Sequence, residues 1–107
     1  MDFIREEYAT IIDRRDNPAE NSYTRYLFDQ GIDKILKKVG EETAETIIAA
    51  KNGDNAETVG EICDLLYHLL TLMALQGITP DDLDAKLQAR REKSGNLKQF
   101  KKVDKNT

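Results

Sequence analysis

The chain has 107 residues, enough for one small domain with a modest hydrophobic core. Hydrophobic residues make up 39% of it and charged residues 34%, with no tryptophan, which excludes disorder throughout and favours a helical protein over a β-sandwich. The net charge of −4 argues against a nucleic-acid partner. A phosphorylated ligand is still compatible with this charge, because a metal ion can supply the positive charge that it needs.

Three further features of the sequence make the cytoplasm the expected location of the protein. The lone Cys63 excludes an intrachain disulfide, and its apolar neighbours predict a buried thiol. No apolar stretch reaches about 18 residues, so we expect no membrane-spanning helix. The N-terminal residues 1–7 are acidic where a signal peptide would be basic.

Helical spacing of apolar side chains predicts two helices in the first thirty residues. Residues 2–15 form the first, which ends at the sequence Asp-Asn-Pro of residues 16–18. Asn21 or Ser22 is expected to cap a short second helix, and Gly31 closes it.

Two longer helices follow, over residues 32–51 and 56–76, separated by a turn at residues 52–55. Asn55 is the expected cap of the second of them. The predicted apolar face of residues 32–51 consists of Ile32, Ile35, Leu36, Val39, Thr43, Ile47 and Ala50. The segment 56–76 is apolar nearly all round, which predicts a central helix covered on several sides.

A fifth helix is expected to start at Thr79 and Pro80, after Gly77 ends the fourth. The pattern predicts an all-α fold, an antiparallel bundle of four to five helices over residues 1–95, followed by a basic, flexible tail over residues 96–107. One short chain covers the apolar fourth helix poorly, so we expect a homodimer that completes the bundle.

Two acidic pairs lie at mirror-image distances from Gly53. Glu42 and Glu45 precede it, and Glu61 and Asp64 follow it, so that an antiparallel hairpin sets Glu45 opposite Glu61 and Glu42 opposite Asp64. Asp64 interrupts an apolar run, and a buried unpaired carboxylate is costly. Four carboxylates gathered in this way predict an oxygen-ligand site for a hard cation, Mg²⁺ first and Mn²⁺ second.

Lys38 and His68 extend the same two helix faces away from the turn. Carboxylate-bound Mg²⁺ most often meets phosphates, and Lys34, Lys37 and Lys38 are candidates to hold phosphate oxygens. Solvated helix lysines are the favoured interpretation of Lys34 and Lys37, and a satisfied core histidine that of His68. The acidic pairs also have a simpler interpretation, as a solvated face of a non-catalytic helical interaction module.

Two longer segments carry a resemblance to a known family. Residues 37–45, Lys-Lys-Val-Gly-Glu-Glu-Thr-Ala-Glu, and residues 61–70 closely resemble the phosphoribosyl-ATP pyrophosphohydrolase family of histidine biosynthesis. The segment Asn-Ser-Tyr-Thr at residues 21–24 is also similar to that family, and the resemblance covers residues 3 to about 95. The acidic motif alone is shared by the wider all-α, MazG-like superfamily of nucleoside-triphosphate pyrophosphohydrolases.

The resemblance implies a Mg²⁺-dependent homodimeric enzyme that cleaves phosphoribosyl-ATP to phosphoribosyl-AMP and pyrophosphate. It implies that Mg²⁺ binds to Glu42, Glu45, Glu61 and Asp64, and that Glu41, one residue off the stripe, orients or deprotonates the attacking water. The residues that it implies for substrate binding are Lys38, Ser22, Tyr23, Thr24 and His68. Removal of non-standard nucleotides is the alternative activity within the superfamily.

Overall fold

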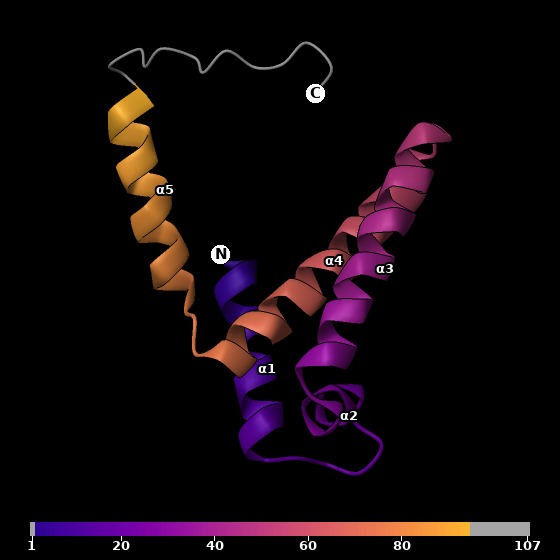
Figure 1. Cartoon of the computed structure of the whole chain (residues 1–107), viewed down its shortest axis with the longest axis vertical. Coiled ribbons are helices and arrows are strands. Elements are labelled where there is room, and N and C mark those ends of the chain that lie inside the picture. Colours follow the sequence, from indigo (N-terminus) through magenta and orange to yellow (C-terminus); the bar gives the residue numbers. More distant parts are fainter. Residues whose placement is uncertain (1, 95–107) are drawn as a thin grey trace.

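Five α-helices make up the part of the chain that the computed structural model describes, residues 2–94 (Figure 1). They are α1 (Phe3–Asp16), α2 (Tyr23–Gln30), α3 (Ile32–Lys51), α4 (Asn55–Gln76) and α5 (Pro80–Ser94). These residues include no strand, so the prediction of an all-α fold is confirmed. The predicted tail, residues 96–107, lies outside the described residues.

Local capping fixes where the helices begin and end. The Ser22 Oγ accepts the backbone N–H of Arg25 at 3.2 Å, as expected for the cap of α2. The expectation that Asn55 caps α4 is wrong, because Asp54 does so through a 3.0 Å bond from the Glu57 N–H. Its carboxylate is an equally good acceptor and lies one residue earlier, so the helix gains Asn55 as its first residue.

The helices α3 and α4 form an antiparallel hairpin, and α1 and α2 pack against its open end (Figure 1). The core lies at this end, where Ile11 of α1 meets Leu70, Met73 and Ala74 of α4. Leu27 and Ile35 bury the contact between α2 and α3. The other half of the hairpin, toward the turn at Gly53, extends beyond this core (Figure 1).

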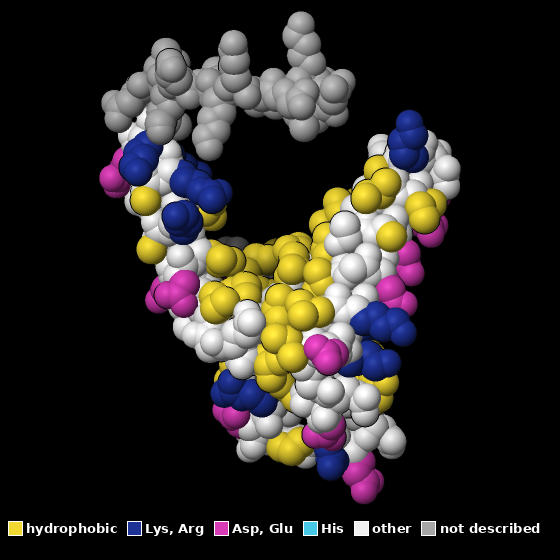
Figure 2. All heavy atoms as spheres, in the orientation of Figure 1, with side chains coloured by type: hydrophobic (Ala, Val, Ile, Leu, Met, Phe, Trp, Pro, Cys, Tyr) yellow, Lys and Arg dark blue, Asp and Glu magenta, His cyan; other side chains and the backbone are white. Residues whose placement is uncertain are grey.

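The fifth helix diverges from the hairpin and gives the described chain the shape of a V (Figure 1). Its start is held to α1 by Arg5, which forms ion pairs with Asp81 and Asp84. An apolar groove of about 580 Å³ lies between α4, α1 and α5. Figure 2 shows hydrophobic side chains along the floor of the V.

The predicted apolar face of α3 is mostly exposed, which corrects the expectation that it packs within the chain. Of that face only Ile35 is buried, whereas Leu36 is 47% and Ile47 59% exposed. The other buried residues of α3 are Glu42 and Ala49, which follow Ile35 at seven-residue steps. The helix therefore turns the stripe that carries the acids inward and leaves its apolar face open.

The central helix α4 is also incompletely covered. By length and composition it is apolar enough to cross a membrane, a property that the core helices of soluble proteins share, and 22% of that apolar window is buried in the chain. Cys63 is exposed, so the prediction of a buried thiol is wrong. The reason is that its neighbours Ile62 and Leu66 are themselves exposed, at 42% and 39%.

Candidate metal and phosphate site

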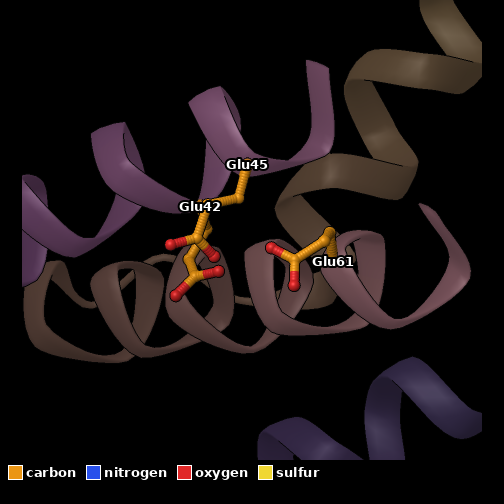
Figure 3. A group of neighbouring side chains, drawn as sticks. All are labelled: Glu42, Glu45 and Glu61. Carbon is orange, nitrogen blue, oxygen red and sulfur yellow. The ribbon is translucent and has the colours of Figure 1, made fainter. Parts of the chain in front are cut away.

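Three glutamates converge between α3 and α4 (Figure 3). Glu42 and Glu45 come from α3, one turn apart, and Glu61 comes from α4. One carboxylate oxygen from each lies within 4.8 Å of the others. The hairpin thus brings Glu45 opposite Glu61, as the mirror symmetry about Gly53 predicts.

Two members of this cluster are wholly or partly buried, which is unusual for acidic groups, whereas Glu45 is exposed. Glu42 is only 7% exposed. Its Oε2 and the Oε2 of Glu61 are the buried side-chain oxygens or nitrogens without a hydrogen-bond partner among the described residues. A buried carboxylate oxygen without a donor is destabilising, so this pair of oxygens is the kind of donor set that fits a hard divalent cation.

Mutual repulsion within the cluster shifts the pKa values of its members. The close approach of the Glu45 carboxylate, which can share a proton, raises the pKa of Glu61 to about 7, with burial adding to the effect. Burial raises the pKa of Glu42, and Glu45 and Asp64 add to the rise. The pKa of Glu45 is lowered, because Glu61 and Glu42 act as its hydrogen-bond donors. The three groups therefore titrate together.

Asp64 lies at the rim of the cluster. The expectation that it is buried is wrong for the single chain, where it is exposed, and it is not one of the three converging acids. The reason is that the neighbouring faces of α4 are themselves uncovered. Its negative charge still raises the pKa of both Glu42 and Glu61, so it faces the same space.

The Lys38 ammonium lies on the side of the cluster away from the turn. Its Nζ is 3.9 Å from Glu42 Oε1 and 3.8 Å from Glu41 Oε1, distances typical of loose ion pairs. Glu41 is half exposed and lies beside the acidic stripe, as predicted. On the opposite side, the turn end, a cleft of about 260 Å³ is lined by Glu45, Glu57, Glu61 and Asp54 among others.

Of the four remaining candidates, Tyr23, Thr24 and His68 take part in hydrogen bonds between α2 and α4, whereas Ser22 caps α2. The His68 Nδ1 lies 2.7 Å from the backbone oxygen of Asp64, which can only accept, so Nδ1 carries the proton. The Nε2 atom therefore accepts from the Tyr23 hydroxyl at 2.9 Å. His68 is 5% exposed and Thr24 is 3% exposed, and Ser22 is used as a cap. Among these four, Tyr23 has the most open side chain, at 45%.

The sequence pattern alone does not identify Tyr67 or Tyr26 as parts of this region. The Tyr67 hydroxyl bonds Thr24 Oγ1 and joins α2 to α4. The ring of Tyr26 stacks beside that of Tyr23, with centroids 6.0 Å apart. Tyr23 and Tyr26 are three residues apart on a short helix, which indicates that they share a face. The same spacing also fits an ordinary apolar face.

Comparison with known proteins gives one consistent family. The phosphoribosyl-ATP pyrophosphohydrolase family model matches residues 4–91. A phosphoribosyl-ATP pyrophosphatase of Pelotomaculum thermopropionicum is 59% identical over 86% of this chain and 94% of its own length. One of Clostridium novyi is 51% identical over 92% and 89%. The chain is also 52% identical to a bifunctional histidine biosynthesis protein of Lactococcus lactis, over 92% of this chain and 47% of that protein.

Glu61→Gln is expected to raise the melting temperature of the metal-free chain by several degrees at pH 8 and by much less at pH 5. The raised pKa of Glu61 means that the folded chain keeps a proton that the unfolded chain loses above its ordinary pKa of 4.5. Stability from this group is therefore present at low pH and is lost as the pH rises toward about 7. Thermal melts with EDTA measure the effect.

Glu57→Gln is the matched control, since Glu57 lies one turn earlier on α4 and is exposed. It should change the melting temperature little at either pH. Equal changes at pH 5 and pH 8 for Glu61→Gln, or none at either pH, would contradict the repulsion described here.

Proposed function

Because the chain belongs to the phosphoribosyl-ATP pyrophosphohydrolase family, we propose that it hydrolyses phosphoribosyl-ATP to phosphoribosyl-AMP and pyrophosphate with the help of Mg²⁺. This reaction is a step of histidine biosynthesis. The structural observation that carries the proposal is the group of three carboxylates with two buried, unpaired oxygens. Oxygen ligands of this kind suit Mg²⁺ first and Mn²⁺ second.

In this proposal Glu42, Glu45 and Glu61 hold the metal, and Asp64 completes the set from the rim. Mg²⁺, when bound, supplies positive charge to phosphate oxygens and makes a bound water more acidic. The carboxylates of the chain fix the place of that charge, because two of them come from one helix turn and the third from the facing helix.

The neighbouring charged residues act on the water and the phosphates. Glu41 accepts the proton of the attacking water, and it is half exposed and thus open to solvent. The water oxygen forms a bond to a phosphorus of the anhydride between the α and β phosphates, the bridging P–O bond at that phosphorus breaks, and its electron pair stays on the bridging oxygen of the leaving group. Lys38 contacts the phosphate oxygens through its ammonium group. This group lies 3.9 Å from Glu42 Oε1 and is therefore next to the proposed metal ligands.

Residues at the start of α2, together with His68, take part in substrate binding. Tyr23, which is nearly half exposed, is the member that contacts the nucleotide directly. Ser22 and Thr24 hold the start of α2 in place, and His68 fixes the Tyr23 hydroxyl. We also place the enzyme in the cytoplasm, with no nucleic acid or membrane as partner.

A homodimer completes the fold in this proposal. The groove of about 580 Å³ between α4, α1 and α5 is lined mainly by leucines and other apolar side chains. The exposed apolar residues beyond it include Ile47, Ile48, Val59 and Ile62, near the hairpin turn. Apolar surface of this extent is typical of an interface, and a second copy supplies the missing cover for α4.

Pyrophosphate release tests the reaction and its metal dependence together. The chain is expected to release pyrophosphate from phosphoribosyl-ATP far faster than from dUTP or dCTP, and EDTA should abolish the activity. Asp64→Asn should lower kcat by at least about a hundredfold, because it removes one charge from the metal set without disturbing the core. Circular dichroism should show an unchanged helical content.

Full activity of Asp64→Asn, or equal rates with dUTP, would contradict this proposal. Asp33→Asn is the control, since Asp33 is exposed in the first turn of α3 and away from the cluster. Its activity should match that of the unmodified chain.

Leu87→Asp is expected to convert the dimer to monomers of 12.2 kDa at micromolar concentration. Leu87 is 55% exposed and lines the groove, so its replacement costs the isolated chain little but places a charge in the interface. Light scattering with size exclusion measures the mass. Lys86→Asp, on the adjacent exposed position, should remain dimeric, and a monomeric unmodified chain would contradict the dimer.

A further inference from the structure

An aromatic surface lies beyond Lys38, at the end of the site away from the hairpin turn. Tyr23 and Tyr26 are 45% and 43% exposed. Their ring planes are 25° apart and their centroids 6.0 Å apart, so they form one nearly continuous patch. Tyr67 continues it inward, with its ring 6.1 Å from that of Tyr23.

Hydrogen bonds hold this aromatic patch at a fixed position relative to the acidic cluster. The Tyr23 hydroxyl donates to His68, and His68 donates to the backbone oxygen of Asp64. Two hydrogen bonds therefore connect the ring to the turn of α4 that carries a proposed metal ligand. The bond between Thr24 and Tyr67 adds a second tie between α2 and α4. A surface held in this way is preorganised, which lowers the entropic cost of binding a flat ligand.

Positive charge runs along α3 from this patch to the acids. The Lys34 Nζ lies 5.8 Å from the centroid of the Tyr26 ring, and Lys38 follows four residues later, near Glu42. Each step of four residues is about 6 Å along the helix. The turn end of the site has instead Asp54 and Glu57 in its cleft, which repel a polyanion.

We propose that this patch is the subsite for the nucleoside end of the substrate, with the aromatic base stacked against Tyr26. The inference rests on the proposed function and assigns the direction in which the nucleotide lies: phosphates over the acids and Lys38, base beyond them toward α2. Tyr26 and Lys34 thereby become binding residues for the nucleotide.

The chemistry of the patch favours a base over a phosphate group alone. A phosphate site needs cations and N–H or O–H donors; the face of a tyrosine ring is neither, and the Tyr23 hydroxyl already donates to His68. A base has a flat π-face, and its stacking on an aromatic side chain stabilises binding by about 1–3 kcal/mol in nucleic-acid complexes. The ammonium of Lys34 lies over the Tyr26 ring, 5.8 Å from its centroid, so a base that stacks on that face takes its place and leaves its positive charge next to the ligand.

The test compares Tyr26→Ala, Tyr26→Leu and Tyr26→Phe in the full-length chain. The first two should raise KM for phosphoribosyl-ATP and weaken AMP binding about tenfold, because the ring is lost. Tyr26→Phe keeps the ring and should restore AMP binding, because stacking needs the ring and not the hydroxyl. Inhibition by pyrophosphate should be unchanged in all three. Arg25→Ala is the matched control on α2, where Arg25 pairs with Asp29 at 3.5 Å.

Unchanged AMP binding in Tyr26→Ala and Tyr26→Leu would overturn the inference. So would an equal loss of pyrophosphate inhibition, or a change of oligomeric state in light scattering, which would assign the patch to the contact between copies. Calorimetric titration with AMP needs no turnover. If the unmodified chain releases no pyrophosphate from any nucleotide, the proposed function fails, and the AMP titration still decides whether Tyr26 stacks a base.

Discussion

Three carboxylates held within 4.8 Å of one another repel each other, and the α3–α4 hairpin nevertheless holds them together. The helices supply this geometry through the seven-residue spacing of Ile35, Glu42 and Ala49, which turns the acidic stripe of α3 toward α4. A proton shared with Glu45, burial and the repulsion together raise the pKa of Glu61 to about 7. In the proposed function a divalent cation relieves this repulsion, so the interaction that opposes folding of the metal-free chain is also the one that binds the metal.

The same hairpin explains why the chain leaves much apolar surface exposed. With its acidic stripe turned inward, α3 presents its apolar face, including Leu36 and Ile47, to the outside. The helix α4 is likewise apolar and only partly covered, and α5 extends away from the bundle (Figure 1). The proposed dimer gives both surfaces one cause: a chain of this length turns its acids inward at the proposed metal site and leaves part of its core for a second copy to cover.

Much of this was predictable from the sequence because it depends on local rules. Helix bounds follow from caps and glycines such as Ser22, Gly31 and Gly77, and the opposition of Glu45 and Glu61 follows from helical periodicity and the turn. Burial was predicted less well. Asp64 and Cys63 lie in an apolar run, yet they are exposed, because periodicity reports which face is apolar and not what covers it.

The network around Tyr23 lies beyond sequence reasoning for a different reason. It joins α2 to α4 across 45 residues, and no spacing rule relates Tyr23 to His68. The family resemblance pointed to Tyr23 and His68 separately. The hydrogen bond between them is what sets the aromatic patch at a fixed distance from the acids, and with it a direction for the nucleotide.

Crystals grown with Mn²⁺ in place of Mg²⁺ test the central claim most directly, by anomalous diffraction at the manganese edge. The account predicts an anomalous peak between the carboxylates of Glu42, Glu45 and Glu61, with Asp64 turned toward it. Well-ordered crystals at millimolar Mn²⁺ with no peak there, or with the metal only on other acids, would contradict it.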